Sequence, residues 1–80
     1  MIDKTTAKPM RVKQEGRSGP YLTIPVEQVE EVKKVLDQAR IRYWVAEIAI
    51  SINGRPATTV VNFGKTMDPQ AIQSELDGAN

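Results

Sequence analysis

The tripeptide Gly64-Lys65-Thr66 matches the end of the motif with which P-loop proteins cradle nucleotide phosphates. That motif begins with another glycine, five residues before the glycine of its Gly-Lys-Thr end, and this chain has Thr59 at that position. Residues 59–63 have the composition of a strand, which cannot curl around a phosphate. Asp68 stands where the next helix is expected to begin, and a carboxylate there repels the anions that a helix N-terminus otherwise attracts. The tripeptide therefore predicts a turn between a strand and a helix.

A second stretch with chemical potential is GRSGPY, residues 16–21. Its glycines permit close approach of the backbone to a ligand, its arginine has a fork suited to phosphate or carboxylate, and its serine and tyrosine supply hydroxyls. With two preceding cations it forms a candidate site for a small anionic ligand. The candidate binding residues are Arg11, Lys13, Arg17, Ser18 and Tyr21. Two glycines and a proline between strands are more often only a hairpin loop, which is the alternative interpretation.

Histidine and cysteine are both absent from the chain. The missing histidine removes the commonest general base near neutral pH and the commonest transition-metal ligand. The missing cysteine excludes disulfides, thiolate chemistry and cysteine-based metal sites. Glu47 stands in a predicted strand with no second carboxylate placed beside it by spacing, so a paired-carboxylate mechanism has no support. We expect a protein that is not an enzyme, with no catalytic residue, no metal site and no cofactor.

Charge is unevenly distributed along the chain, although the formal net charge is only +1. Residues 1–20 carry five cations and two carboxylates, whereas residues 66–80 carry three carboxylates and no cation. A basic N-terminal third can steer an anionic partner, so nucleic-acid binding is an alternative function. The cations concerned are Lys8, Arg11, Lys13 and Arg17, with Arg40 and Arg42 as potential neighbours. The acidic C-terminal end and the small net charge weigh against this alternative.

Length and composition are those of one ordinary globular domain. The chain has 80 residues, of which 40% are hydrophobic and 26% charged. No apolar run approaches the roughly 18 residues of a membrane span, and the N-terminus lacks the apolar segment of a signal peptide. We therefore expect a soluble, cytoplasmic protein with no membrane partner.

The hydrophobic pattern predicts the order of the elements. Residues 1–9 are polar and aperiodic, and we expect them to form a flexible tail before a single domain over residues 10–80. Within that domain the pattern predicts strands at 10–15, 21–24, 42–52 and 55–63, and helices at 25–40 and from Asp68 onward. The resulting order is β(β)αββα. The economical fold is an α+β two-layer sandwich, with a mainly antiparallel sheet and both helices on one face.

The dipeptide Asn53-Gly54 is the leading signal for a two-residue hairpin turn. Extended along both flanking strands, such a turn places Trp44 opposite Phe63 at the end of an apolar face. We therefore expect Trp44 and Phe63 to lie in the core.

The other face of the same hairpin remains uncovered if both helices lie on the first face. It is a mosaic of apolar and polar side chains, and exposed mosaics of this kind often mark interfaces. The candidate interface residues are Tyr43, Val45, Glu47 and Val60. The leading hypothesis is a small non-enzymatic domain that acts through protein association at a sheet face or edge, with self-association into a homodimer as its simplest form. Nucleic-acid binding and small-anion binding are the alternatives.

Overall fold

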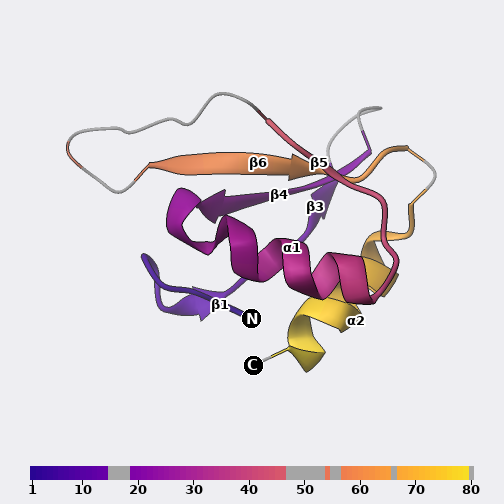
Figure 1. Ribbon diagram of the computed structural model, residues 1–80, viewed down its shortest axis with the longest axis horizontal. Helices are drawn as coiled ribbons and strands as arrows, with labels where there is room; N and C mark the ends of the chain where they lie inside the picture. The colour runs from indigo at the N-terminus through magenta and orange to yellow at the C-terminus, as the bar shows by residue number, and fades with distance from the viewer. Residues whose placement is uncertain (15–18, 47–53, 55–56, 66, 80) are drawn as a thin grey trace.

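The computed structural model of the chain describes residues 1–14, 19–46, 54, 57–65 and 67–79 (Figure 1). The strands are β1 (Ile2–Asp3), β2 (Lys8–Pro9), β3 (Lys13–Gln14), β4 (Pro20–Pro25), β5 (Trp44–Val45) and β6 (Thr58–Asn62). The helical elements are the 3-10 turn η1 (Val26–Gln28), α1 (Val29–Gln38) and α2 (Pro69–Gly78).

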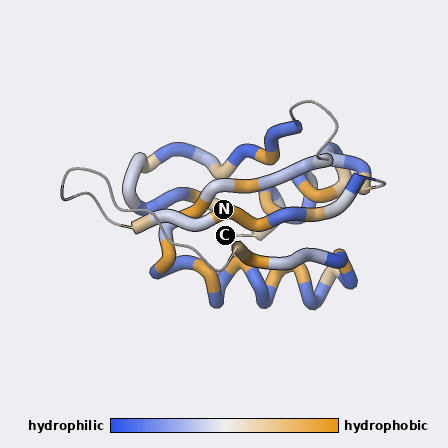
Figure 2. The backbone as a smooth tube through the Cα atoms, turned by 90° about the horizontal axis from the view of Figure 1, so that it is seen from above, coloured by the Kyte–Doolittle hydropathy of each residue, from blue (hydrophilic) through white to orange (hydrophobic). Residues whose placement is uncertain are grey.

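Four of the strands form one antiparallel sheet in the order β3-β4-β6-β5, and β1 and β2 form a separate antiparallel pair. Both helices lie below β4 and β6 in Figure 1, so the view from above in Figure 2 looks onto the strands, with α1 along one side. The predicted α+β class, with a mainly antiparallel sheet, is confirmed. Across the described residues, neither helix combines the length and the apolarity that crossing a membrane requires.

The core lies between the sheet and the two helices. Leu22 and Ile24, alternate residues of β4, are fully buried, and Leu22 pairs with the buried Val61 of β6. The core as a whole consists of Met10, Leu22, Ile24, Val32, Leu36, Val61, Phe63, Ile72 and Leu76. Because side chains alternate along a strand, the residues between these core positions point to the opposite side of the sheet. We call that side, away from the helices, the open face.

The helix α1 follows Pro25 through the 3-10 turn, close to the predicted start, and ends in a left-handed cap. Arg40 has a φ of 57°, the N–H of Ile41 donates to the Leu36 carbonyl at 3.0 Å, and the N–H of Arg40 donates to the Asp37 carbonyl at 3.1 Å. These are the two hydrogen bonds of a Schellman cap. Glycine is preferred at its left-handed position, because that conformation costs other residues roughly 1–2 kcal/mol.

The helix α2 begins as the sequence predicts. Its first residue is Pro69, and the Oδ1 atom of Asp68 accepts a hydrogen bond from the N–H of Gln70 at 2.9 Å. Residues 58–62 are extended in β6, and Lys65 lies in a turn. The Gly-Lys-Thr tripeptide therefore follows a strand rather than closing a phosphate loop, as predicted.

Residues 1–9 differ from the flexible tail expected from the sequence, because they contain the paired strands β1 and β2. The hairpin is held by Gln28, whose side chain is 1% exposed. The Oε1 atom of Gln28 accepts from the N–H of Lys4 at 2.8 Å, and its Nε2 donates to the Ile2 carbonyl at 2.9 Å. The amide thus pairs with the hairpin backbone as a neighbouring strand would.

A second glutamine holds the segment that follows the hairpin. The Oε1 atom of Gln73 on α2 accepts from the N–H of Val12 at 2.8 Å, and its Nε2 donates to the Met10 carbonyl at 2.9 Å. Each glutamine joins segments that are distant in the sequence. Local hydrophobic periodicity carries no trace of such bonds, which is why the sequence pattern suggested a tail.

The pairing of β5 with β6 is one residue away from the predicted register. Trp44 pairs with Asn62, and Val45 pairs with Val61. A two-residue turn at Asn53-Gly54 requires a different pairing, with Trp44 opposite Phe63. Asn53 lies outside the described residues. Because side chains alternate with a period of two, this shift exchanges the two faces of β5.

The shift makes one core prediction right and the other wrong. Phe63 is 2% exposed, as predicted, whereas Trp44 is 57% exposed on the open face. The smaller side chain of Val45 takes the helix-facing position level with Val61. The indole instead lies against a bare glycine: its Cη2 atom is 3.7 Å from where a Cβ on Gly64 would be. A large ring is thus accommodated outside a core that is already filled.

Candidate functional site

The edge formed by β5 is the first candidate site. Among the described residues, β5 is hydrogen-bonded to β6 on one side, and β3 forms the opposite edge of the sheet. The β3 edge carries Arg11 and Lys13, and charged edges discourage pairing with other chains. Residues 43–46 are uncharged, so the β5 edge lacks this protection.

The backbone of β5 offers a free donor and acceptor at Val45. The N–H of Ala46 donates to the Val60 carbonyl at 2.8 Å, so the polar groups of Ala46 face β6. In an antiparallel ladder, successive residues direct their N–H and C=O groups alternately toward and away from the paired strand. The N–H and C=O of Val45 therefore face the free edge, where an added strand would pair with them.

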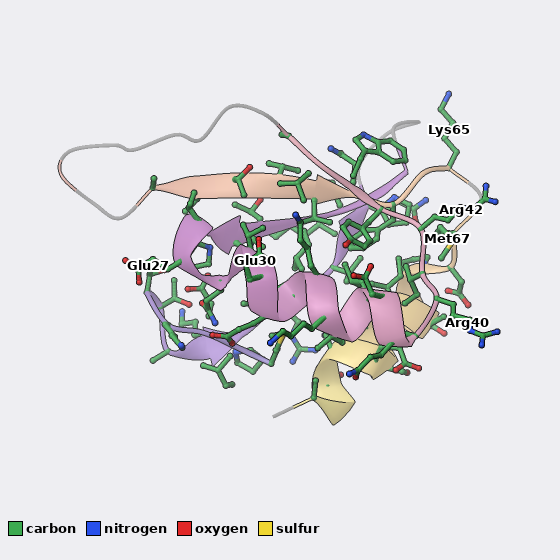
Figure 3. All side chains as sticks on the ribbon, viewed as in Figure 1. Glu27, Glu30, Arg40, Arg42, Lys65 and Met67 are labelled. Atoms are coloured by element: carbon green, nitrogen blue, oxygen red, sulfur yellow. The ribbon has the colours of Figure 1, made fainter. Side chains whose placement is uncertain are left out.

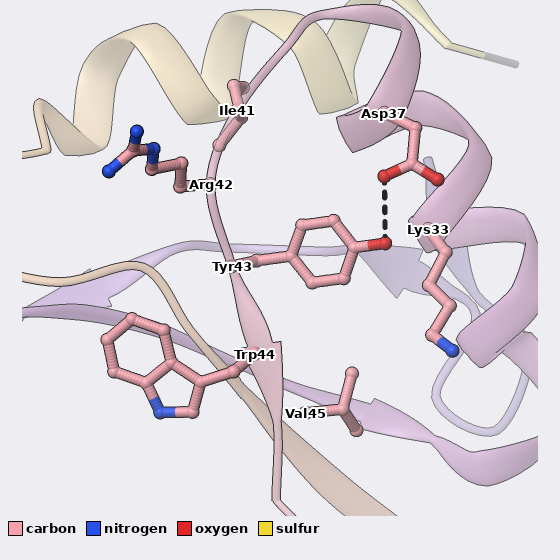
Figure 4. A pocket seen from close by; sticks show the side chains of 7 residues that line it. All are labelled: Lys33, Asp37, Ile41, Arg42, Tyr43, Trp44 and Val45. Atoms are coloured by element: carbon pink, nitrogen blue, oxygen red, sulfur yellow. Dashed lines mark hydrogen bonds between the residues drawn. The ribbon is translucent and has the colours of Figure 1, made fainter.

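An open depression of about 720 Å³ runs between this edge and α1 (Figure 4). We call it the edge recess. It is lined by Lys33, Asp37, Ile41, Arg42, Tyr43, Trp44 and Val45. The recess combines aromatic and aliphatic walls with two cations and one carboxylate.

Tyr43 links the two walls of the edge recess. Its hydroxyl donates to the Oδ1 atom of Asp37 at 2.9 Å, which ties the segment before β5 to the last turn of α1 (Figure 4). Burial, followed by the hydrogen bond to Asp37, raises the pKa of Tyr43 above its ordinary value of 10.0. The ring therefore stays neutral and donating at physiological pH, and it fixes the position of the edge.

The predicted interface residues are only partly brought together. Tyr43 and Val45 were expected on the uncovered face, but both point toward α1 and line the edge recess (Figure 4). The one-residue register shift explains this exchange of faces. Val60 on β6 is half-buried and lies level with Ala46. It is on the open face, as the sequence predicts. Glu47 lies outside the described residues.

The predicted anion-binding set is described in part. Lys13 on β3 pairs with Tyr21 on β4, so these two residues are neighbours, and Arg11 is exposed nearby in the chain. Arg17 and Ser18 lie outside the described residues. Of the five predicted residues, the structure thus places Lys13 and Tyr21 opposite each other on adjacent strands.

The second glycine of GRSGPY has a packing role. Gly19 has a φ of 85°, and a Cβ built on it would lie 2.8 Å from the carbonyl carbon and oxygen of Gly64. Two segments of backbone therefore pass in direct contact, which only glycine at position 19 allows. This packing accounts for Gly19 without a ligand.

Two residues of the open face, the exposed Trp44 and the half-buried Asn62, were missed by the sequence analysis. Trp44 was assigned to the core, and Asn62 was not singled out, yet the two are paired on the open face. A usable signal existed in β6, where the apolar Val61 and Phe63 flank the polar Asn62. That alternation directs Asn62 outward, but it fits either register and so does not by itself identify Trp44 as the residue opposite Asn62.

Comparison of the chain with known protein-family models, curated proteins and solved structures finds no match. The function is therefore argued from the geometry of these surfaces.

Proposed function

We propose that this chain is a non-enzymatic protein-association domain that binds by strand addition along the free edge of β5. The occupant that we propose is β5 of a second copy. The observation that carries the proposal is the outward-facing N–H and C=O of Val45 beside the edge recess. In strand addition, main-chain hydrogen bonds supply affinity, and pockets for alternate side chains supply specificity.

The side chains around the edge support this mode of binding. An added strand alternates its side chains between the two faces of the sheet. One set would enter the edge recess, where Ile41, Tyr43 and Val45 offer apolar and aromatic contacts. The other set would lie on the open face beside Trp44, which is 57% exposed. Tyrosine and tryptophan are enriched at the cores of protein interfaces.

A second copy fits the edge because antiparallel pairing of two β5 strands is self-complementary. A twofold axis places the same uncharged segment, residues 43–46, on both sides of the contact, so no like charges meet at its centre. Two four-stranded sheets would then continue into one another. A domain of this size buries only about 60–65% of its unfolded surface, so association adds burial where it is scarce.

Sedimentation equilibrium over a wide range of concentrations tests the proposal with two variants of one residue. Val45→Pro removes the N–H that faces the free edge and spares the ladder to β6. Val45→Ala also shortens the side chain but keeps that N–H, so it is the matched control. We expect reversible dimers for the wild type and Val45→Ala, and a monomer with an unchanged circular dichroism spectrum for Val45→Pro.

Two outcomes would contradict the proposal. A wild-type chain that stays monomeric at every concentration would exclude a second copy as the occupant. A Val45→Pro variant that dimerises as tightly as Val45→Ala would show that the contact lies elsewhere.

A further inference from the structure

The open face carries a row of four side chains, of which strand addition along β5 would contact only Trp44. Lys13 pairs with Tyr21, Tyr21 with Asn62, and Asn62 with Trp44, so one row crosses β3, β4, β6 and β5. We call it the open-face row. Residues paired in register share a face of the sheet. Because adjacent strands are about 4.8 Å apart, Tyr21 and Trp44 are separated by about 10 Å across the sheet.

Trp44 presents aromatic surface on this row. It is 57% exposed, although its ring approaches the chain at Gly64, where no side chain can cover it. Its position is fixed by pairing with Asn62 and by the next residue, Val45, which packs against the core. An indole that is held in place and exposed is a platform on which another flat ring can stack.

Cations without a carboxylate partner surround the row. Lys13 is in the row itself, and continuing the β5-β6 register brings Arg42 level with Gly64, next to Lys65. Arg42 and Trp44 point to the same side of the segment, away from α1 (Figure 4). Within the described part of the chain, no ion pair involves any of these three cations.

Two ion pairs are found away from the open face, among the described residues. Lys4 lies 3.0 Å from Glu31, and Lys33 lies 3.8 Å from Glu30. Figure 3 shows Glu27 at one end of the molecule and Arg40, Arg42 and Lys65 toward the other. Lys34 on α1 and Arg40 after it form no ion pair among the described residues either, so what distinguishes the cations around the row is the exposed aromatic ring beside them.

We propose that the open face binds single-stranded nucleic acid. One base stacks on the exposed Trp44 and another on the half-buried Tyr21, while Lys13, Arg42 and Lys65 contact phosphates. Aromatic platforms combined with cations that follow the backbone are the chemistry by which proteins hold unpaired strands. A duplex is excluded, because its bases are stacked on each other and their faces cannot reach the rings.

Asn62 occupies the position between the two rings. Its side-chain amide carries both donors and an acceptor, and it can hydrogen-bond the edge of a base that is stacked on a neighbouring ring. The row therefore supplies stacking at Tyr21 and Trp44 and base-edge contact at Asn62. A modest base preference follows, superimposed on binding that is otherwise tolerant of sequence.

The chain's single tryptophan provides a direct readout. Titration of the wild-type protein with a single-stranded oligonucleotide at low salt should quench the fluorescence of Trp44, because stacking on a base does so. Tyr21→Leu should weaken binding about tenfold or more, in line with the loss of one stacked base. With three cations engaged, the logarithm of affinity should fall against the logarithm of salt concentration with a slope of about −2.

Matched variants separate the open face from general electrostatics. Lys13→Gln should weaken binding and reduce the salt slope by about 0.7, whereas Lys34→Gln, with the same change in net charge at an exposed position of α1, should do neither. Val45→Pro should bind the oligonucleotide like the wild type, so failure of strand addition and failure of this proposal are distinguishable.

Three results would overturn the proposal: absence of quenching at low salt, equal binding of single strands and duplex, or equal weakening by Lys13→Gln and Lys34→Gln. A second chain added at β5 would also lie beside Trp44, so the titration uses a protein concentration at which the wild type is monomeric.

Discussion

Replacement of Arg40 by glycine should stabilise the fold. The left-handed φ of 57° at Arg40 costs a residue with a side chain roughly 1–2 kcal/mol, and glycine removes that cost. Glycine also has more conformational freedom in the unfolded chain, which reduces the gain in stability by about 0.4–1 kcal/mol. The net gain in the free energy of unfolding is about 1 kcal/mol, which corresponds to a rise in Tm of about 4–8 °C for a domain of this size. Urea unfolding followed by circular dichroism measures it.

Two neighbouring substitutions make this prediction specific to the cap. Ala39→Gly, at a right-handed position with φ of −83° and ψ of −3°, should lower stability by roughly 0.5–1 kcal/mol. Arg40→Ala removes the charge but keeps the left-handed strain, and should stay within about 0.5 kcal/mol of the wild type. The reasoning fails if Arg40→Gly is no more stable than Arg40→Ala, or if Ala39→Gly is equally stabilising.

Three further predictions concern packing, the N-terminal hairpin and pH. Gly19→Ala should lower the free energy of unfolding by roughly 2–5 kcal/mol, because the strain of a left-handed φ adds to a clash with the Gly64 backbone. Gly64→Ala should lower it by only about 1–2 kcal/mol, because it introduces the strain without a clash. Urea unfolding compares the two variants. Gln28→Leu should lower the free energy of unfolding by about 1–3 kcal/mol and speed amide hydrogen exchange in residues 2–4. Unchanged exchange in these residues would contradict the role of Gln28 in holding the hairpin. Burial and Asp37 raise the pKa of Tyr43, so the folded protein holds this proton more tightly than the unfolded chain does. The free energy of unfolding should therefore fall as pH rises above 10.0, and it should fall less in Tyr43→Phe. Unfolding curves measured across this pH range will show the difference.

The elements that the sequence predicts well are those with local signals. Asp68 followed by Pro69 announces the start of α2, because a capping carboxylate and a proline satisfy the first turn without tertiary help. The apolar residues of α1 recur along one side of the helix, and this local pattern is enough to place Val32 and Leu36 in the core. The strand character of residues 59–62 also suffices to reject a phosphate loop at the Gly-Lys-Thr tripeptide.

The register of β5 depends on more than local signals. The Asn53-Gly54 dipeptide suggests one pairing, while the alternation of Val61, Asn62 and Phe63 is compatible with either. Size decides between them: the valine fits the helix-facing position, and the indole finds space only against a glycine on the open face. A large apolar side chain was assumed to be buried, although exposed ones are common at sites of recognition.

The N-terminal hairpin was missed for a different physical reason. It is held by the side-chain amide of Gln28, whose bonds to the backbone replace a sheet neighbour, while Gln73 on α2 holds the segment that follows it. Nothing in the composition of residues 1–9 encodes these partners. Polar residues on an otherwise apolar helix surface were the available clue, because a buried amide requires hydrogen-bonding partners.

Amide hydrogen exchange at Val45, followed by NMR at low and high protein concentration, tests the central claim most directly. Its N–H faces the free edge of β5, whereas the neighbouring Ala46 N–H is bonded to Val60 at 2.8 Å and serves as an internal reference. Association through the edge predicts that Val45 exchanges rapidly in dilute solution and becomes protected as concentration rises, while protection of Ala46 stays nearly constant. Exchange at Val45 that is independent of concentration, in a chain that nevertheless dimerises, would contradict association through this edge.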